Sequence, residues 1–193
     1  MLVATMVVRL HFDLYAVFWL LEITSYVPEL YSHREAKDIF STMMMTSLVF
    51  SAVWSPLIGY VVDKINPRVI LPIPFLVRAF GLYLYIQNDD PSSLYAMLSA
   101  IVIVFGFIFE LITVEAIFLR NLDKEIRGLA VGTNTMVGIL SQFILALLGG
   151  RLYDSMGPKA PFWYVLVADL LFVVVVVIFG GLLGWIKNDI RRD

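Results

Sequence analysis

The stretch Gly59-Tyr-Val-Val-Asp63-Lys64-Ile-Asn66-Pro67-Arg68 interrupts two long apolar runs. Charge is scarce elsewhere, because 60% of the residues are hydrophobic, only 16% are charged, and the mean hydropathy is +0.86. This composition is too apolar for an ordinary soluble domain. The charged stretch therefore predicts a loop between two membrane-spanning segments of an integral multi-pass membrane protein.

Working outward from this stretch, the chain divides into six apolar runs. A helix that crosses a hydrocarbon core of about 30 Å needs about 20 mostly apolar residues. The runs are continuous and long, unlike the roughly ten alternating residues of a barrel strand. We therefore expect a single all-α membrane domain over residues 1–193, with six transmembrane helices near residues 10–31, 38–62, 69–87, 94–119, 128–152 and 162–186.

An even number of spans places both termini on one side, so the basic residues can be counted by face. The side of the termini carries nine lysines and arginines, and the other side carries four: Arg34, Lys37, Arg151 and Lys159. Cytoplasmic loops of membrane proteins are enriched in basic residues. The count therefore predicts that both termini and the loop around Asp63 lie in the cytoplasm or its equivalent. It does not identify the membrane.

A second glycine-aspartate pair indicates internal symmetry. Gly150 and Asp154 repeat the spacing of Gly59 and Asp63, 91 residues later, and follow the fifth run as the first pair follows the second. The two copies would then face opposite sides of the membrane, as in an inverted repeat of two three-helix units. The alternative is that glycine and aspartate simply end two helices.

Three segments carry a resemblance to the major facilitator superfamily of secondary transporters: Gly59–Arg68, Glu125–Gly132 and Gly149–Trp163. The match is similar to the C-terminal six-helix half of that fold, since the arginine-rich fourth helix typical of the other half is absent. Asn66 replaces a usual glycine and Pro67 a usual basic residue. Asparagine tolerates the left-handed backbone that the glycine supplies, so the turn is expected to persist.

In that family the first charged segment forms a cytoplasmic gating loop, which implies this role for Gly59, Asp63, Lys64 and Arg68. The Asp63 carboxylate would lie near the start of the fifth span, where Arg127 and the helix dipole offer positive charge. Breaking this contact would shift a conformational equilibrium. The alternative is a loop whose charges only mark the cytoplasmic boundary.

Five ionisable residues fall inside the spans, and such residues are functional candidates by default. They are Glu22, Arg78, Glu110, Glu115 and Asp169. Glu115 and Asp169 lie nearer the span ends and suggest side chains that reach water or pair locally. The family architecture implies that Glu22 and Glu110 face the central pathway for substrate or protons, with Arg78 behind them as a charge partner.

One arginine can neutralise only one of two carboxylates. The remaining desolvated acid could exchange protons as the pathway alternates between faces, which would couple transport to a proton gradient. The alternative is a static polar network. Glycines spaced four residues apart, Gly128 with Gly132 and Gly180 with Gly184, predict close helix contacts, with bending during transport as the other interpretation.

Several functions are excluded by what the sequence lacks. There is no cysteine, and two histidines are too few for an imidazole metal site. No phosphate-binding glycine loop or catalytic nucleophile with a base is present, so an enzyme, a cofactor or a metal site is not expected. A net charge of −2 argues against nucleic acid as a partner.

Length complicates the transporter prediction, because the family uses two six-helix halves and 193 residues supply one. Three arrangements are open. The chain could work with a separate second half, it could form a homodimer, or it could be a structural subunit of a larger membrane complex that no longer transports. Its partners would be lipid and either a second half or that complex. Fold does not fix the solute, the coupling ion or the direction of transport.

Overall fold

The computed structural model describes residues 12–26, 33–120, 125 and 127–182, which form helices joined by short turns and contain no strand. Two long helices, α3 (His33–Lys64) and α7 (Arg127–Met156), are joined to the helices that follow them by turns of two and three residues. The helices are α2 (Phe12–Tyr26), α3 (His33–Lys64), α4 (Pro67–Ile70), α5 (Pro72–Ile86), α6 (Leu94–Arg120), α7 (Arg127–Met156) and α8 (Ala160–Leu182).

Each expected span overlaps one long helix, except that the third is divided into α4 and α5. The division falls at Leu71, directly before Pro72, which has no backbone N–H to continue the helical ladder. Among the described residues, three helices are long and apolar enough to cross a membrane: Glu35–Lys64, Leu94–Arg120 and Ala160–Ile178. The apolar helix Pro72–Ile86 is shorter.

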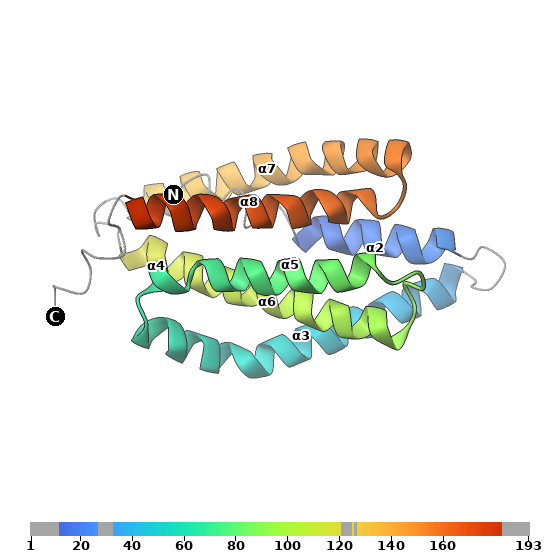
Figure 1. The fold of residues 1–193 in the computed structure, drawn as a ribbon, viewed down its shortest axis with the longest axis horizontal. Coiled ribbons are helices and arrows are strands. Elements are labelled where there is room, and N and C mark those ends of the chain that lie inside the picture. The colour runs from blue at the N-terminus through green and yellow to red at the C-terminus, as the bar shows by residue number, and fades with distance from the viewer. Residues whose placement is uncertain (1–11, 27–32, 121–124, 126, 183–193) are drawn as a thin grey trace.

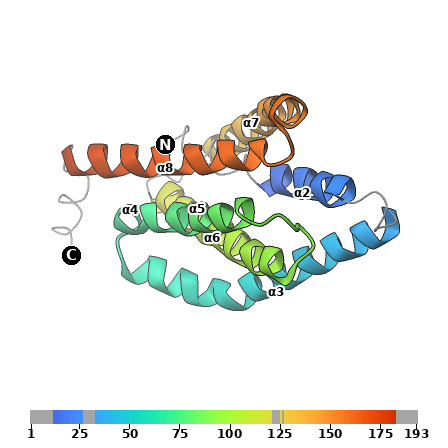
Figure 2. The ribbon, with the colours of Figure 1, turned by 45° about the vertical axis from the view of Figure 1, so that its right-hand side comes forward.

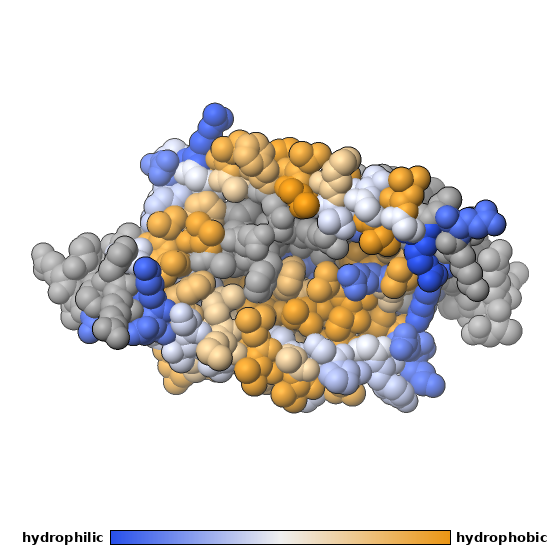
Figure 3. All heavy atoms as spheres, turned by 180° about the vertical axis from the view of Figure 1, so that it is seen from behind, coloured by the Kyte–Doolittle hydropathy of each residue, from blue (hydrophilic) through white to orange (hydrophobic). Residues whose placement is uncertain are grey.

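The long helices run roughly along one direction, with α5 and α6 between α3 and the pair α7–α8 (Figure 1). The α3–α4 turn lies at one end of the molecule and the α7–α8 turn at the other (Figures 1 and 2). Seen from behind, hydrophobic residues cover much of the surface between these ends, and hydrophilic residues gather toward the ends (Figure 3). This distribution suits a protein whose flanks contact hydrocarbon.

The segment around Asp63 is more helical than the sequence predicts. Asp63 lies in the last turn of α3, and the turn itself consists of Ile65 and Asn66. The Asn66 carbonyl accepts hydrogen bonds from the N–H groups of Val69 and Ile70, at 2.9 and 3.3 Å. No described residue other than glycine has a positive φ, so the prediction of a left-handed Asn66 is wrong. Asparagine before proline instead begins a new helix, with proline at its first position.

Close backbone contact occurs at glycines other than those predicted. A Cβ on Gly106 of α6 would lie 2.8 Å from the backbone nitrogen of Arg78, and a Cβ on Gly81 of α5 would lie 2.9 Å from that of Ile103. At Gly128 and Gly132, by contrast, a Cβ would meet nothing within 4 Å, so the predicted contacts there are wrong. The surroundings of Gly180 and Gly184 lie outside the described residues.

The main core lies toward the end where α5 finishes, and five helices contribute to it. Its large members include Phe18, Trp19, Leu82, Tyr85 and Phe162. Two smaller clusters pack α5, α6 and α8 around Phe75, and α3, α4 and α6 around Ile58. The most extensive helix contact joins α5 to α6, which the two glycines allow to approach closely.

Candidate functional site

Three charged side chains from three helices meet in the middle of the bundle. Arg78 of α5 donates from Nε to Asp169 Oδ2 of α8 at 2.8 Å, and its Nη2 contacts Asp169 Oδ1. Its Nη1 forms an ion pair with Glu110 Oε2 of α6. All three side chains are 0% exposed. We refer to Arg78, Glu110 and Asp169 as the buried triad.

The helices position the triad through close packing. The guanidinium of Arg78 lies over the Phe75 ring, one turn earlier in α5, with its carbon 5.1 Å from the ring centroid. Phe75 in turn packs against Phe172 of α8, with tilted rings whose centroids are 4.2 Å apart. On the other side, Gly106 lets α6 approach the Arg78 backbone. The planar guanidinium of arginine suits two-point binding of one carboxylate, and here that carboxylate belongs to Asp169.

The charge count of the triad is unbalanced. Burying an ion pair costs several kcal/mol per ion and is offset only by good geometry and hydrogen bonds. Asp169 receives two contacts from the guanidinium, whereas Glu110 Oε1 has no hydrogen-bond partner among the described residues. One cation faces two carboxylates, so the fully ionised triad carries one excess negative charge. A proton or a small cation would neutralise it.

Glu22 belongs to a separate site. Its Oε2 accepts a hydrogen bond of 2.5 Å from the hydroxyl of Tyr85 in α5, and its side chain is 3% exposed. The Tyr85 ring is held between Trp19 and Phe162, with centroid distances of 4.6 and 4.8 Å. Trp19 Nε1 is buried without a hydrogen-bond partner among the described residues.

The two sites lie on one face of α5. Arg78 and Tyr85 are seven residues apart, two helical turns, which corresponds to about 10 Å along the axis. Of the two acids considered in the sequence, Arg78 contacts Glu110, and its second carboxylate is Asp169 instead of Glu22. Glu22 and Glu110 are both buried inside the described bundle and are not presented on its outer surface.

At the Asp63 end, the structure gives that carboxylate a different cation from the expected one. Asp63 Oδ1 lies 3.1 Å from Arg120 Nη2 at the end of α6, and the two side chains are 75% and 45% exposed. Among the described ion pairs, none joins Asp63 to Arg127, which is exposed at the start of α7. The end of α6 lies nearer to α3 in space because these two helices pack extensively.

The remaining residues of the predicted gating loop occupy the same end. Lys64 Nζ lies 5.7 Å from the centroid of the Tyr60 ring. A Cβ on Gly59 would have open space around it, so this glycine is not required by a close contact in the described part of the chain. Arg68 lies in α4, and its side chain is outside what the structure describes.

Sequence reasoning missed Asp169 and Tyr85 as site residues. Asp169 was expected near a span end, but it is the tenth residue of the 23-residue helix α8, well inside it. A signal was present, since it is the one charged side chain in an otherwise apolar helix. Tyr85 gave no signal, because a buried tyrosine in a helix is ordinary. Among the described residues, no group of three His, Cys, Asp or Glu side chains could hold a metal ion.

The family model described as Major Facilitator Superfamily matches residues 2–186. The chain belongs to the major facilitator superfamily. No curated protein matches it. Members of this family are transporters of small solutes and not enzymes, and the long apolar helices agree with a membrane location. In a family of transporters, buried ionisable side chains inside an apolar bundle are the candidate functional site.

Proposed function

We propose that this chain supplies six transmembrane helices of a secondary active transporter, which moves a small solute together with a second six-helix half. The observation that carries the proposal is the buried triad in a member of this family. Three charges enclosed by apolar helices are costly to retain, and proton or ion relays in transporters use such groups. The second half would come from another part of a longer chain, from another chain or from a second copy.

An inverted three-plus-three repeat is supported by matching burial. When the sequence is shifted by 91 residues, Arg78 falls on Asp169, and α5 as a whole falls on α8. Buried positions then coincide: Pro74 and Phe75 with Val165 and Leu166, and Trp19 and Glu22 with Glu110 and Thr113. Equivalent residues of two inverted units can touch only near the axis that relates them. The Arg78–Asp169 contact fits that expectation.

The repeat extends through both turns, where Asn66-Pro67-Arg68 corresponds to Gly157-Pro158-Lys159. The two turns lie at opposite ends of the bundle (Figure 1). With the excess of basic residues on the side of the termini, we place Asp63 and both termini in the cytoplasm or its equivalent. The exposed Asp63–Arg120 pair would then hold α3 against α6 on that side in one state of the transport cycle.

We further propose that transport is coupled to protons through Glu22 and Glu110. Glu110 belongs to a triad with one excess negative charge, and proton binding would remove that excess. Glu22 is buried beside the Tyr85 hydroxyl, which can accept or donate as the carboxyl group gains or loses a proton. Arg78 would stay charged throughout and hold the two acids of the triad in place.

The experiment uses purified protein in liposomes that enclose a pH-sensitive dye. An imposed pH gradient is applied with a panel of small organic cations, amino acids and sugars. We expect solute-dependent proton movement that is lost in Glu22→Gln and Glu110→Gln and retained in Glu115→Gln. Glu115 is the matched control, because it is an exposed acid on the same helix as Glu110. Equal proton movement in all three variants would show that coupling does not pass through these residues.

A non-transporting subunit of a larger membrane complex is the second candidate. The observation that favours it is that Glu22 and Glu110 are buried within this chain, where Glu22 is hydrogen-bonded to Tyr85 and Glu110 is ion-paired with Arg78. Departures from the family loop at Asn66 and Pro67 point the same way. Native mass measurement after gentle detergent extraction separates the candidates, since a pair of six-helix units supports transport and a stable many-subunit assembly supports the structural role.

A further inference from the structure

The end of the bundle opposite Asp63 is closed by a lysine. Lys159 stands directly before α8, and its Nζ donates to the carbonyl oxygens of Ile86, at 2.9 Å, and Asn88. The Asp89 carboxylate lies 3.8 Å from the same atom. The last carbonyls of a helix lack intrahelical partners and carry partial negative charge, so an ammonium group is a good cap for α5. Lys159 is 27% exposed and thus reaches water.

The buried Glu22–Tyr85 pair lies directly behind this cap. Tyr85 precedes Ile86, the last residue of α5, and Glu22 is four residues before Tyr26, the last described residue of α2. At 1.5 Å per residue, Glu22 is about 6 Å from that end of α2. In the described part of the chain, the titratable side chains that act on this pair from neighbouring elements include Lys159, which acts on Glu22, and Tyr153 of α7, which acts on Tyr85.

The turn that carries Lys159 has a defined geometry. Gly157 adopts a φ of +96°, which favours glycine, and its N–H donates to the Tyr153 carbonyl at 3.0 Å. The Tyr153 ring stacks on Phe18 of α2, with centroids 5.9 Å apart. The turn is therefore attached to α2 through Tyr153 and to α5 through Lys159, the two helices that supply Glu22 and Tyr85.

We propose that the α7–α8 turn is a gate, closed by Lys159, which controls the access of protons from that face of the membrane to Glu22. The proposal rests on the proposed function, in which Glu22 exchanges protons. Lys159 is held by the two carbonyl groups and the nearby Asp89 carboxylate, and an ionised Glu22 adds to the attraction. When Glu22 binds a proton it loses its negative charge, and its attraction for Lys159 is lost. Proton binding to Glu22 and opening of the turn therefore favour each other.

The absence of cysteine makes the gate testable with a single introduced thiol. Ile23 is 1% exposed and adjacent to Glu22, so Ile23→Cys reports access to the site. The full chain in liposomes is treated with a charged, membrane-impermeant maleimide, and the labelling rate is measured. We expect slow labelling in this parent and at least about tenfold faster labelling after Lys159→Met, which removes charge-assisted hydrogen bonds. Lys159→Arg should remain slow.

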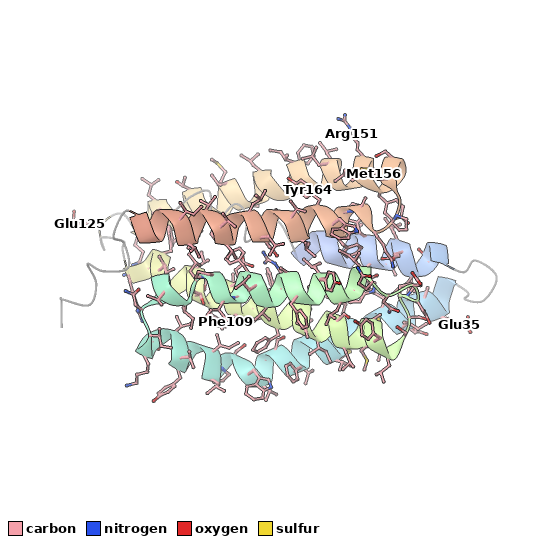
Figure 4. The ribbon with its side chains drawn as sticks, viewed as in Figure 1. Glu35, Phe109, Glu125, Arg151, Met156 and Tyr164 are labelled. Atoms are coloured by element: carbon pink, nitrogen blue, oxygen red, sulfur yellow. The ribbon has the colours of Figure 1, made fainter. Side chains whose placement is uncertain are left out.

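The control is Arg151→Met, which removes one exposed basic charge from α7, where Arg151 points away from the bundle (Figure 4). It should leave labelling unchanged. Val165→Cys in α8, also 1% exposed, is the second reporter in case Ile23→Cys does not fold. Equal labelling rates in Lys159→Met and the parent, with both retaining their helical circular dichroism, would overturn the gate.

Proton flux measured in the same liposomes separates the two proposals. Fast labelling of Lys159→Met in vesicles whose parent shows no solute-dependent flux supports the gate and rejects transport by this chain. Unchanged labelling with normal parental flux rejects the gate alone. Adding Glu22→Gln to the Ile23→Cys parent should accelerate labelling about threefold or more, and an unchanged rate would reject the coupling between Glu22 and the turn.

Discussion

Gly106 offers a sharp test of how the buried triad is held. A methyl group at this position would lie 2.8 Å from the backbone nitrogen and 3.0 Å from the Cα of Arg78. Carbon atoms in favourable contact are about 3.5 to 4.0 Å apart, so α5 and α6 must separate by roughly 0.5 to 1 Å. The obstacle is backbone and cannot rotate aside. We therefore expect Gly106→Ala to destabilise the protein by about 1 to 3 kcal/mol.

The chain provides a matched control in Gly132→Ala. Gly132 is also inside a long helix, but a Cβ there would meet nothing within 4 Å. Because alanine restricts the unfolded chain and favours the helix, this variant should be unchanged or more stable by up to about 1 kcal/mol. Stability would be followed by circular dichroism during denaturation in mixed detergent micelles. If Gly106→Ala and Gly132→Ala unfold at the same denaturant concentration, then α5 and α6 do not approach each other closely at Arg78.

Three further predictions concern polar contacts. Arg78→Met should lower stability by about 3 to 5 kcal/mol, because it leaves two buried acids without their cation, and replacing both acids by their amides in that background should recover most of the loss in the same assay. Arg120→Gln should change the free energy of unfolding by less than about 1 kcal/mol, since its partner Asp63 is exposed. If this variant nevertheless changes proton flux in liposomes, the change would come from a shift in the conformational equilibrium and not from unfolding. Ser93→Ala should cost about 1 kcal/mol in denaturation, because Ser93 Oγ accepts from the N–H of Ala96 in the first turn of α6, whereas Ser92→Ala, outside that cap, should cost less.

The helices were predictable from the sequence because a helix that crosses a bilayer needs a long, mostly apolar run of residues. Each expected span overlaps a helix, although the third is divided between α4 and the shorter α5, and the all-helical fold class and the family follow from the same residues. The turns were predicted less well. A charged segment looks like a loop, but Asp63 remains in α3, since a helix can carry charge wherever its end reaches water.

The site was only partly predictable, because the position of a residue in the sequence does not show which residues of other helices it contacts. Glu22, Arg78 and Glu110 are recognisable as charges within spans, yet their pairing depends on which helices touch. Asp169 lies 91 residues from its partner, and α5 meets α8 only after the whole chain is folded. The same limitation explains the glycines, whose spacing predicted contacts in α7 while the contacts occur between α5 and α6.

The polar contacts differ in strength, and this ranking indicates which helices separate first in a transport cycle. The triad joins α5 to α8 through buried, charged hydrogen bonds and α5 to α6 through a buried ion pair, and removing the arginine from such a group costs about 3 to 5 kcal/mol. The exposed Asp63–Arg120 pair between α3 and α6 contributes at most about 1 kcal/mol. The Glu22–Tyr85 bond and the Lys159 cap on the α5 carbonyls are intermediate. The proposed protonation of Glu22 would therefore release α2 and the α7–α8 turn, while α5, α6 and α8 stay together as one unit.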